Sequence, residues 1–257
     1  MALQKTHIAR PTAFNGFIAP VDIVIPFHGQ YGKVADLVKS IFRFTFSNSY
    51  RIYLVDDHSP NKEFGESLNS LQWTKCIRSN EQLGFGGAMN LGFQQTKNSW
   101  VVFIQSDCLV EDTNWLKSLG DSLQNLKGQG VRMVSPRTNN PLGDERHEVL
   151  KFKKEDHRQD FVLTDIPLPM YCFMVHRELF NRVGGFVKSY PYGYYEDEEF
   201  AYRLNKHGYK QGISGKSWIY HEGQSTFKDL WRHDPETLKI MEDNKDLCVK
   251  DMRSIKT

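Results

Sequence analysis

Residues 21–60 read VDIVIPFHGQYGKVADLVKSIFRFTFSNSYRIYLVDDHSP and decide the fold. The β-branched run Val21–Pro26 predicts a buried strand, and Arg51–Asp56 predicts a second one. Between them, Lys33–Phe46 predicts a helix, because its apolar side chains recur at helical spacing: Val34, Leu37, Val38, Ile41 and Phe42. A strand, a helix and a strand in succession indicate a parallel βαβ unit.

The same alternation continues toward the C-terminus. Further strands are predicted at Cys76–Arg78, Trp100–Gln105 and Val131–Ser135, and the helices between them at Phe64–Leu71, Gly87–Thr96 and Asn114–Leu126. Strands and helices that take turns favour the α/β class, with a mostly parallel central sheet covered by helices on both faces.

The second half of the chain begins with a stretch that lacks this regular alternation of strands and helices. Residues 137–168 are polar and weakly periodic, which predicts a long excursion over the surface. Regular structure is predicted to resume at Met170–Val175, followed by helices at 177–183 and 196–207, and Trp218–His221 predicts the final strand. We expect an N-terminal arm (1–20), one domain (21–226) with halves 21–136 and 137–226, and a charged helical tail (227–257).

Composition excludes several classes of protein. Charged residues make up 25% of the 257 and the net charge is +2, so no global field points to nucleic acid or an anionic membrane. No apolar run approaches the roughly 20 residues that span a bilayer, and the N-terminus has no apolar signal-peptide core. Four cysteines without a CxxC pair favour reduced thiols and a cytoplasmic protein without a zinc site.

Polar residues follow three of the predicted strands. Pro26, Phe27 and His28 follow the first strand, Asp57 follows the second, and the run Gln105-Ser106-Asp107 ends the fourth. Asp and Ser after a strand are also ordinary turn residues. Because ligands of open α/β sheets bind beyond the carboxyl ends of the strands, the coincidence at three strands indicates a binding site.

The loop NEQLGFGGAMNLG (80–92) runs into a helix through Gly84, Gly86 and Gly87. Glycines allow a ligand to approach the main chain closely, and a helix N-terminus favours phosphate or a polar sugar. The loop is not a P-loop, because no Gly-Lys-Ser/Thr follows. Asn90 has two interpretations, either a ligand contact or a buried amide that holds the loop.

Four consecutive acids open the helix predicted at 196–207. Glu199 precedes Arg203 by four residues, which predicts a surface ion pair, and Glu198 is predicted to face water. Glu196 and Asp197 are expected on the buried side, where desolvation makes a carboxylate a stronger base. The alternative for all four is charge that complements the helix dipole. His221 ends the last strand, a position that favours function over structure.

Taken in chain order, these segments resemble glycosyltransferase family 2, an inverting family with the GT-A fold. The resemblance covers about residues 20–226 and rests on VDIVIPFHG, LVDDHSP, SNEQLGFGGAMNLG, IQSD with Trp115-Leu116, RVGGF, YYEDEEFAYRLNKHGY and IYHEGQS. It implies a nucleotide-sugar-binding half at 21–136 and an acceptor and catalytic half at 137–226.

The resemblance also implies roles for individual residues. Asp107 and His221 would bind Mn²⁺ or Mg²⁺ at the diphosphate, and Asp197 would be the catalytic base, with Glu196 beside it as the fallback. The implied donor-binding residues are Pro26, Phe27, Asp57, Asn80, Gly84, Gly86, Gly87, Asn90, Gln105 and Ser106. The partners would be a UDP- or dTDP-sugar and a hydroxyl acceptor such as a glycan, with no nucleic acid.

Two positions depart from the family pattern. Gln105 stands where the DxD motif has its first carboxylate, which leaves Asp107 as the anionic metal ligand of that motif. Val187 stands where the family often has Asp after Gly-Gly-Phe. Two other functions stay open at this point: a sugar-1-phosphate nucleotidyltransferase, and an inactive protein that binds nucleotide sugars or carbohydrate.

Overall fold

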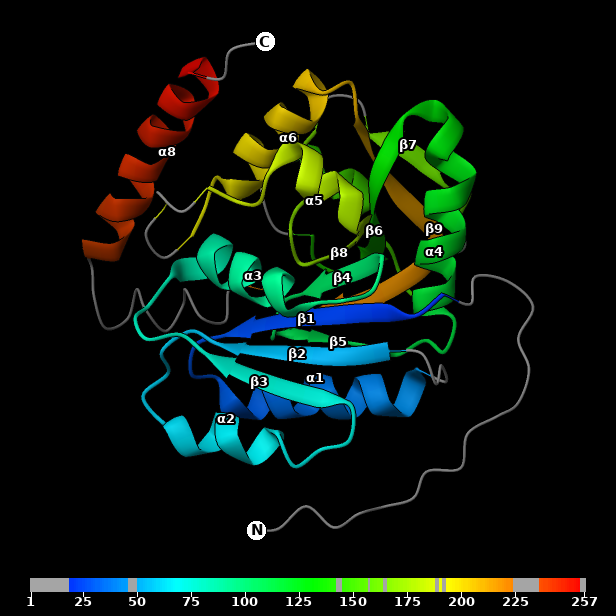
Figure 1. The fold of residues 1–257 in the computed structure, drawn as a ribbon. Helices are drawn as coiled ribbons and strands as arrows, with labels where there is room; N and C mark the ends of the chain where they lie inside the picture. The colour runs from blue at the N-terminus through cyan, green and yellow to red at the C-terminus, as the bar shows by residue number, and fades with distance from the viewer. Residues whose placement is uncertain are drawn as a thin grey trace.

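The computed structural model describes residues 19–45, 50–141, 145–156, 158–163, 166–187, 190, 193–223 and 236–254. Over these residues the chain forms a nine-stranded mixed sheet with helices on both faces (Figure 1). The predicted α/β class, with one central sheet and a C-terminal helix, is confirmed.

The elements follow the sequence closely in its first half. In chain order they are β1 (Val21–Phe27), α1 (Tyr31–Phe44), β2 (Tyr50–Asp56), α2 (Lys62–Leu68), β3 (Thr74–Arg78), α3 (Gly84–Gln95), β4 (Trp100–Ile104), β5 (Cys108–Leu109), α4 (Trp115–Leu126), η1 (Lys127–Gln129), β6 (Val131–Thr138), η2 (Glu145–Leu150), β7 (Phe161–Leu163), β8 (Cys172–His176), α5 (Arg177–Val183), α6 (Glu196–Lys206), β9 (Lys210–His221) and α8 (Glu236–Ser254).

The strand order is β3-β2-β1-β4-β8-β6-β9-β5, with β7 paired to β9. Strands β3, β2, β1 and β4 are parallel, β8 is antiparallel to both β4 and β6, and β6 and β9 are parallel. Because β8 reverses direction between β4 and β6, the strands β6 and β9 run in the same direction as β1 and β4. Their C-terminal ends meet along one side of the sheet, the carboxyl edge.

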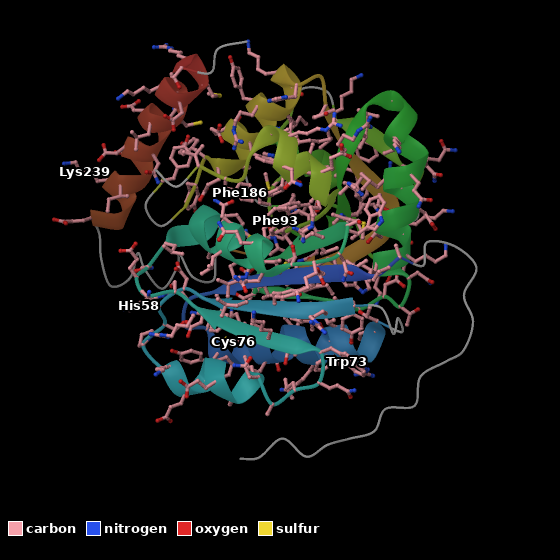
Figure 2. All side chains as sticks on the ribbon, in the orientation of Figure 1. His58, Trp73, Cys76, Phe93, Phe186 and Lys239 are labelled. Atoms are coloured by element: carbon pink, nitrogen blue, oxygen red, sulfur yellow. The ribbon has the colours of Figure 1, made fainter. Side chains whose placement is uncertain are left out.

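Each face of the sheet buries its own apolar cluster. Side chains from α1, α2 and α4 form one cluster, and α3, α5 and α6 cover the other face (Figure 1). The second cluster contains Phe93, Phe103, Phe173, Phe180, Phe186 and Phe200, whose rings contact one another with centroids 4.7–6.4 Å apart. Phe93 and Phe186 lie between α3 and the helices above it (Figure 2). Contacts between rings fix the spacing of α3, α5 and α6 above the sheet.

The final strand is longer than the sequence predicts. Trp218–His221 is only the end of β9, whose earlier part contains Gly212 and Gly215 and lacks the apolar pattern of a strand. A Cβ on Gly212 would lie 2.8 Å from a leucine of α4, and one on Gly215 would lie 2.1 Å from the carbonyl oxygen of Arg158. The glycines therefore allow close packing within the strand. Because they have no side chains, the sequence lacks the apolar pattern from which this part of β9 could be predicted.

The predicted surface excursion at 137–168 also contains regular structure. β6 extends to Thr138, η2 forms a short turn of 3₁₀ helix, and β7 adds an edge strand beside β9. Of the predicted N-terminal arm, residues 1–18 lie outside the described residues, and of the predicted tail, α8 forms a helix. The four cysteines are free thiols. None of the described helices combines the length and apolar character that a bilayer crossing requires.

Candidate active site at the carboxyl edge

Asp107 and His221, the two predicted metal ligands, lie side by side. Asp107 follows β4 and His221 ends β9, and the short strand β5 pairs with β9 so that Cys108 stands opposite His221. His221 Nε2 lies 3.5 Å from Asp107 Oδ1, and their side chains are 1% and 9% exposed. The structure thus brings an imidazole and a carboxylate together at the carboxyl edge, as the sequence predicts.

Hydrogen bonds fix the orientation of the His221 ring. Nδ1 lies 2.7 Å from the carbonyl oxygen of Asn140, and a carbonyl can only accept, so Nδ1 carries the proton in the neutral ring. The Asn139 side chain bonds both the N–H and the C=O of His221, at 2.8 and 3.0 Å. Tyr171 stacks on the imidazole with centroids 5.2 Å apart.

The other ring nitrogen of His221 is buried and has no hydrogen-bond partner. A buried lone pair without a partner is costly, whereas a lone pair on Nε2 with Nδ1–H bonded to a carbonyl is the usual state of a metal-binding histidine. Among the described residues, the ligand atoms of Asp107, Cys108 and His221 lie within 4.8 Å of one another. The Cys108 thiol donates to the Tyr171 carbonyl, and burial raises its pKa well above the ordinary value, so the chemistry favours Asp107 and His221 as the ligands.

Asp57 holds the glycine loop in place. Its Oδ1 accepts the Leu83 N–H at 2.7 Å and its Oδ2 accepts the Gly84 N–H at 3.0 Å, while Ser79 donates to Oδ1. Burial raises the pKa of Asp57, although these hydrogen bonds oppose the rise. The first N–H groups of the loop-to-helix turn are therefore engaged within the protein, a role for Asp57 that the sequence did not reveal.

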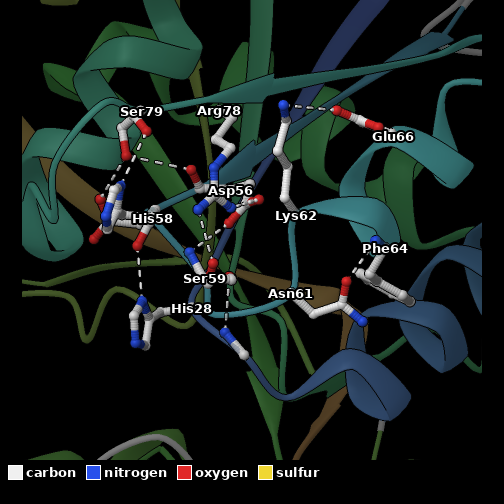
Figure 3. Close-up of polar contacts among 12 residues, drawn as sticks. His28, Asp56, His58, Ser59, Asn61, Lys62, Phe64, Glu66, Arg78 and Ser79 are labelled. Carbon is white, nitrogen blue, oxygen red and sulfur yellow. Dashed lines mark hydrogen bonds and ion pairs between the residues drawn. The ribbon is translucent and has the colours of Figure 1, made fainter.

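The neighbouring Asp56 belongs to the network drawn in Figure 3, which Ser79 connects to Asp57. Its carboxylate pairs with Arg78 at 2.5 Å and accepts the Ser59 N–H at 2.8 Å, and Arg78 also donates to the Ser59 carbonyl. His28 donates to the main-chain carbonyl of Asp57 at 2.7 Å. These bonds tie the ends of β1, β2 and β3 together.

The other predicted donor-binding residues differ in how they are used. Pro26 and Phe27 are buried at the end of β1, and the Phe27 ring packs edge-on against Phe64. Asn80 is exposed. Gln105 and Ser106 lie between β4 and the Asp107–His221 pair, Gln105 half-buried and Ser106 buried.

The glycine loop contacts the later half of the chain directly. Both polar atoms of the Asn90 amide bond the main chain of Phe186, at 2.7 and 2.9 Å, so this side chain connects α3 to the later half of the chain. A Cβ on Gly86 would lie 3.0 Å from the Phe186 Cβ and 3.5 Å from the Glu196 Cγ. Gly84 adopts a positive φ of 70°, and Gly87 lies against the Leu83 side chain.

Strained backbone precedes the acidic helix α6. Tyr194 and Tyr195 have φ values of 75° and 71°, in the left-handed region. Such residues cost on the order of 1–3 kcal/mol each and persist only where the surroundings hold them. Because this turn directly precedes Glu196 and Asp197, it sets the direction in which their carboxyl groups point.

Burial separates Glu196 and Asp197 from ordinary surface acids. Glu196 is 4% exposed, its Oε1 has no hydrogen-bond partner, and burial raises its pKa to about 8. Asp197 is half-buried, and burial together with the charge of Glu198 raises its pKa to about 6. At neutral pH the first is mostly a neutral acid and the second mostly a carboxylate, so Asp197 is the better base of the two.

The prediction for Glu199 was wrong in one respect. It does pair with Arg203, at 2.7 Å from Nη2, but the pair is buried and not on the surface, with side chains 1% and 12% exposed. Arg203 also donates to the carbonyls of Val183 and Gly185. The pair therefore connects α6 to the end of α5.

Three residues that shape the His221 site were missed by the sequence analysis. Asn139, Asn140 and Tyr171 fall in or beside the stretch that was interpreted as a polar excursion. For Asn139 and Asn140 the signal is their position directly after β6, which extends beyond the predicted strand Val131–Ser135.

Comparison with known proteins agrees with this geometry. The family model described as Glycosyl transferase family 2 matches residues 22–184. The human polypeptide N-acetylgalactosaminyltransferase 14 is 29% identical over 121 residues, which are 46% of this chain and 21% of that protein. The aligned part is thus about a fifth of the length of that relative.

Solved glycosyltransferase structures share the fold. The mannosyltransferase PcManGT from Pyrobaculum calidifontis, in complex with GDP-Man and Mn²⁺, has a TM-score of 0.60 at 16% identity, covering 80% of this chain and 57% of that one. GalNAc-T7 with UDP, GalNAc and Mn²⁺ has a TM-score of 0.61 at 17% identity, covering 79% and 44%. S. aureus TarS in complex with UDP-GlcNAc has a TM-score of 0.59 at 15% identity, covering 78% and 58%.

Proposed function

Because the chain belongs to glycosyl transferase family 2, we propose that it moves a sugar from a UDP- or dTDP-sugar to a hydroxyl group of a glycan, with a divalent cation and inversion at the anomeric carbon. Residues 21–136 are proposed to bind the donor and residues 137–226 the acceptor. The family match favours this reaction over nucleotidyl transfer, the alternative left open by the sequence. Solved relatives of the same fold contain nucleotides or nucleotide sugars together with Mn²⁺.

The observation that carries the proposal is the buried, unpartnered Nε2 of His221 beside the Asp107 carboxylate. One neutral imidazole and one carboxylate at the carboxyl edge fit a divalent ion, which Asp107 and His221 would hold. A divalent cation there would stabilise the negative charge that develops on the departing diphosphate. Since imidazole suits Mn²⁺ better than Mg²⁺ and Gln105 supplies no charge, we expect a preference for Mn²⁺.

Asp197 is proposed to take the proton of the acceptor hydroxyl. The acceptor oxygen forms its bond to the anomeric carbon while the bond from that carbon to the diphosphate breaks, and the proton passes to the Asp197 carboxylate. The pKa of about 6 suits this role, because the group is ionised at pH 7 and still basic enough to accept a proton. Its neighbour Glu196, mostly protonated at that pH, leaves Asp197 as the anion.

The test is a panel of UDP- and dTDP-sugars incubated with the protein and Mn²⁺, with release of the nucleoside diphosphate as the measured product. We expect UDP or dTDP release that requires Mn²⁺ and is lost in Asp107→Asn. The matched control is Asp36→Asn, an exposed aspartate of α1 that pairs with Lys39. Release of pyrophosphate in place of the nucleoside diphosphate, or full Mn²⁺-dependent activity in Asp107→Asn, would contradict the proposal.

A further inference from the structure

The C-terminal helix α8 lies beside α6, although it belongs to no layer of the sheet (Figure 1). Its inward side chains include Asn244, which is fully buried, and Cys248, which is 2% exposed. A helix that only covered apolar surface would present leucine or valine at these positions. Polar groups there point to a role beyond apolar packing.

The polar groups of α8 contact the segment that leads into α6. The Asn244 amide donates to the carbonyl oxygen of Gly193 at 2.7 Å in a buried contact. The Cys248 thiol lies 3.8 Å from the carbonyl oxygen of Tyr195. Farther along α8, Asp251 accepts the hydroxyl of the buried Tyr190 at 3.0 Å. Three successive turns of one helix therefore contact Tyr190, Gly193 and Tyr195.

The turn at residues 193–195 has an unfavourable backbone conformation. Tyr194 and Tyr195 are both left-handed, and the residue that caps α6, Tyr195, makes no side-chain cap hydrogen bond. Non-glycine residues leave the left-handed region unless surrounding contacts restrain them. The contacts from Asn244 and Cys248 fall on the residues immediately before and within this strained pair.

We propose that α8 is a positioning element for the transfer reaction, in which Asn244 holds the 193–195 turn so that Asp197 faces the acceptor. Asn244 acts through the main chain of Gly193 and is a positioning residue, not a catalytic one. The inference rests on the proposed function for the role of Asp197, while the restraint of the turn by α8 stands apart from that function.

The experiment compares the full-length wild type with Asn244→Ala, Asn244→Asp and Asp246→Ala. Asn244→Asp keeps the shape of the side chain and removes the amide donor, and Asp246→Ala changes an exposed residue of the same helix. Hydrogen–deuterium exchange is measured on peptides covering residues 193–200 and, as an internal reference, on those covering α3. Steady-state kinetics use the UDP- or dTDP-sugar that the wild type consumes in the panel above.

We expect both Asn244 variants to exchange faster at 193–200 and not in α3, with kcat lowered about 10- to 100-fold, as small displacements of a reacting group can cause. The KM for the donor should stay within about twofold, because the donor half of the site is not touched. Asp246→Ala should match the wild type in both measurements.

Unchanged exchange at 193–200 in folded Asn244→Ala would overturn the inference whether or not the protein is active. Faster exchange with an unchanged kcat would overturn the positioning role, and so would a donor KM that rises in step with the loss of kcat. If the wild type consumes no donor while exchange at 193–200 is faster in the Asn244 variants, the proposed function is contradicted and the restraint of the turn by α8 is not. Tyr190→Phe, which removes the hydroxyl that bonds Asp251, provides a milder variant if the Asn244 variants do not fold.

Discussion

Asp197 and Glu196 show how neighbouring acids can take different protonation states. Glu196 is buried beside Gly86, and Asp197 keeps partial contact with water. Burial raises the pKa of both, to about 8 and about 6. The pattern of apolar residues in the helix predicted the inward placement of the two, but their difference depends on how closely other segments, such as α3 at Gly86, pack against each, which periodicity cannot reveal.

Replacement of Asp197 separates catalysis from donor binding. We expect Asp197→Asn to lower kcat about 10²- to 10⁴-fold while the affinity for UDP with Mn²⁺ stays unchanged, because only proton transfer is lost. The wild-type kcat should rise with pH up to about 6 and then level off, since the base must be ionised. Initial rates from pH 5 to 8 and calorimetric titration with UDP check both points. A near wild-type kcat in Asp197→Asn would place the base elsewhere.

Glu196 makes a prediction about stability. Its pKa in the folded protein, about 8, exceeds the ordinary value of 4.5, so the folded state binds the extra proton. Its contribution to the free energy of unfolding is therefore constant below about pH 4.5 and falls as the pH rises toward 8, by about 1.4 kcal/mol per unit. We expect Glu196→Gln to lose this pH dependence in urea unfolding at pH 5 and pH 8.

The control for that measurement is Glu178→Gln, an exposed acid on α5 that pairs with Arg182. It should keep the pH dependence of the wild type. If Glu196→Gln and the wild type lose the same stability between pH 5 and pH 8, the carboxyl group of Glu196 is not the protonated group inferred above.

At the scale of elements, apolar periodicity predicted most of the first half of the chain and missed part of the second. The strands β1, β2 and β4 are apolar and mostly buried, and α1 and α4 are amphipathic, so the signals were strong. In β9, glycines and polar residues replaced that signal, because the strand packs closely against α4 and the 158–160 segment. The buried position of Glu199 was also not predicted. Its spacing of four residues from Arg203 is the same whether the pair lies on the exposed or on the buried face of the helix.

The packing of α3 on the sheet gives a prediction for Gly92. A Cβ there would lie 2.4 Å from Val24 Cγ1 and 2.8 Å from Val55 Cγ2, so the helix must move away from β1 and β2. We expect Gly92→Ala to lower the free energy of unfolding by about 1–3 kcal/mol, as overpacking does. Gly128→Ala, with nothing within 4 Å of its Cβ, should change it by less than about 0.5 kcal/mol. Equal urea midpoints for the two variants would contradict this packing.

In the whole molecule, the candidate site residues lie along one edge of the sheet. This is because β8 is antiparallel to both β4 and β6, so β6 and β9 run in the same direction as β1 and β4. Listing the residues after each strand predicted Asp57, Asp107 and His221 on this edge. It did not predict that Asp57 would bond the main-chain N–H groups of Leu83 and Gly84, since main-chain donors do not depend on residue type and cannot be identified from a sequence.

A ligand that binds only the folded molecule must stabilise it. At about 100 times its dissociation constant, UDP with Mn²⁺ should add about 2.7 kcal/mol and raise the melting temperature by about 5–10 °C. Addition of EDTA should abolish most of the shift, and His221→Ala should reduce it, because the metal would connect the protein to the diphosphate. A shift by UDP that survives EDTA in full would rule out a metal-mediated contact.

The pairing of β5 with β9 has a consequence for the order of assembly. Asp107 and His221 stand more than a hundred residues apart in the chain, and they meet only when Cys108 pairs with His221 across those two strands. Closing so long a loop is slow, because its entropy must be lost before the contact forms. A chain emerging from the ribosome has its Asp107 long before its His221, so the metal ion proposed for these two residues would bind both of them only after β9 has been made and has paired with β5.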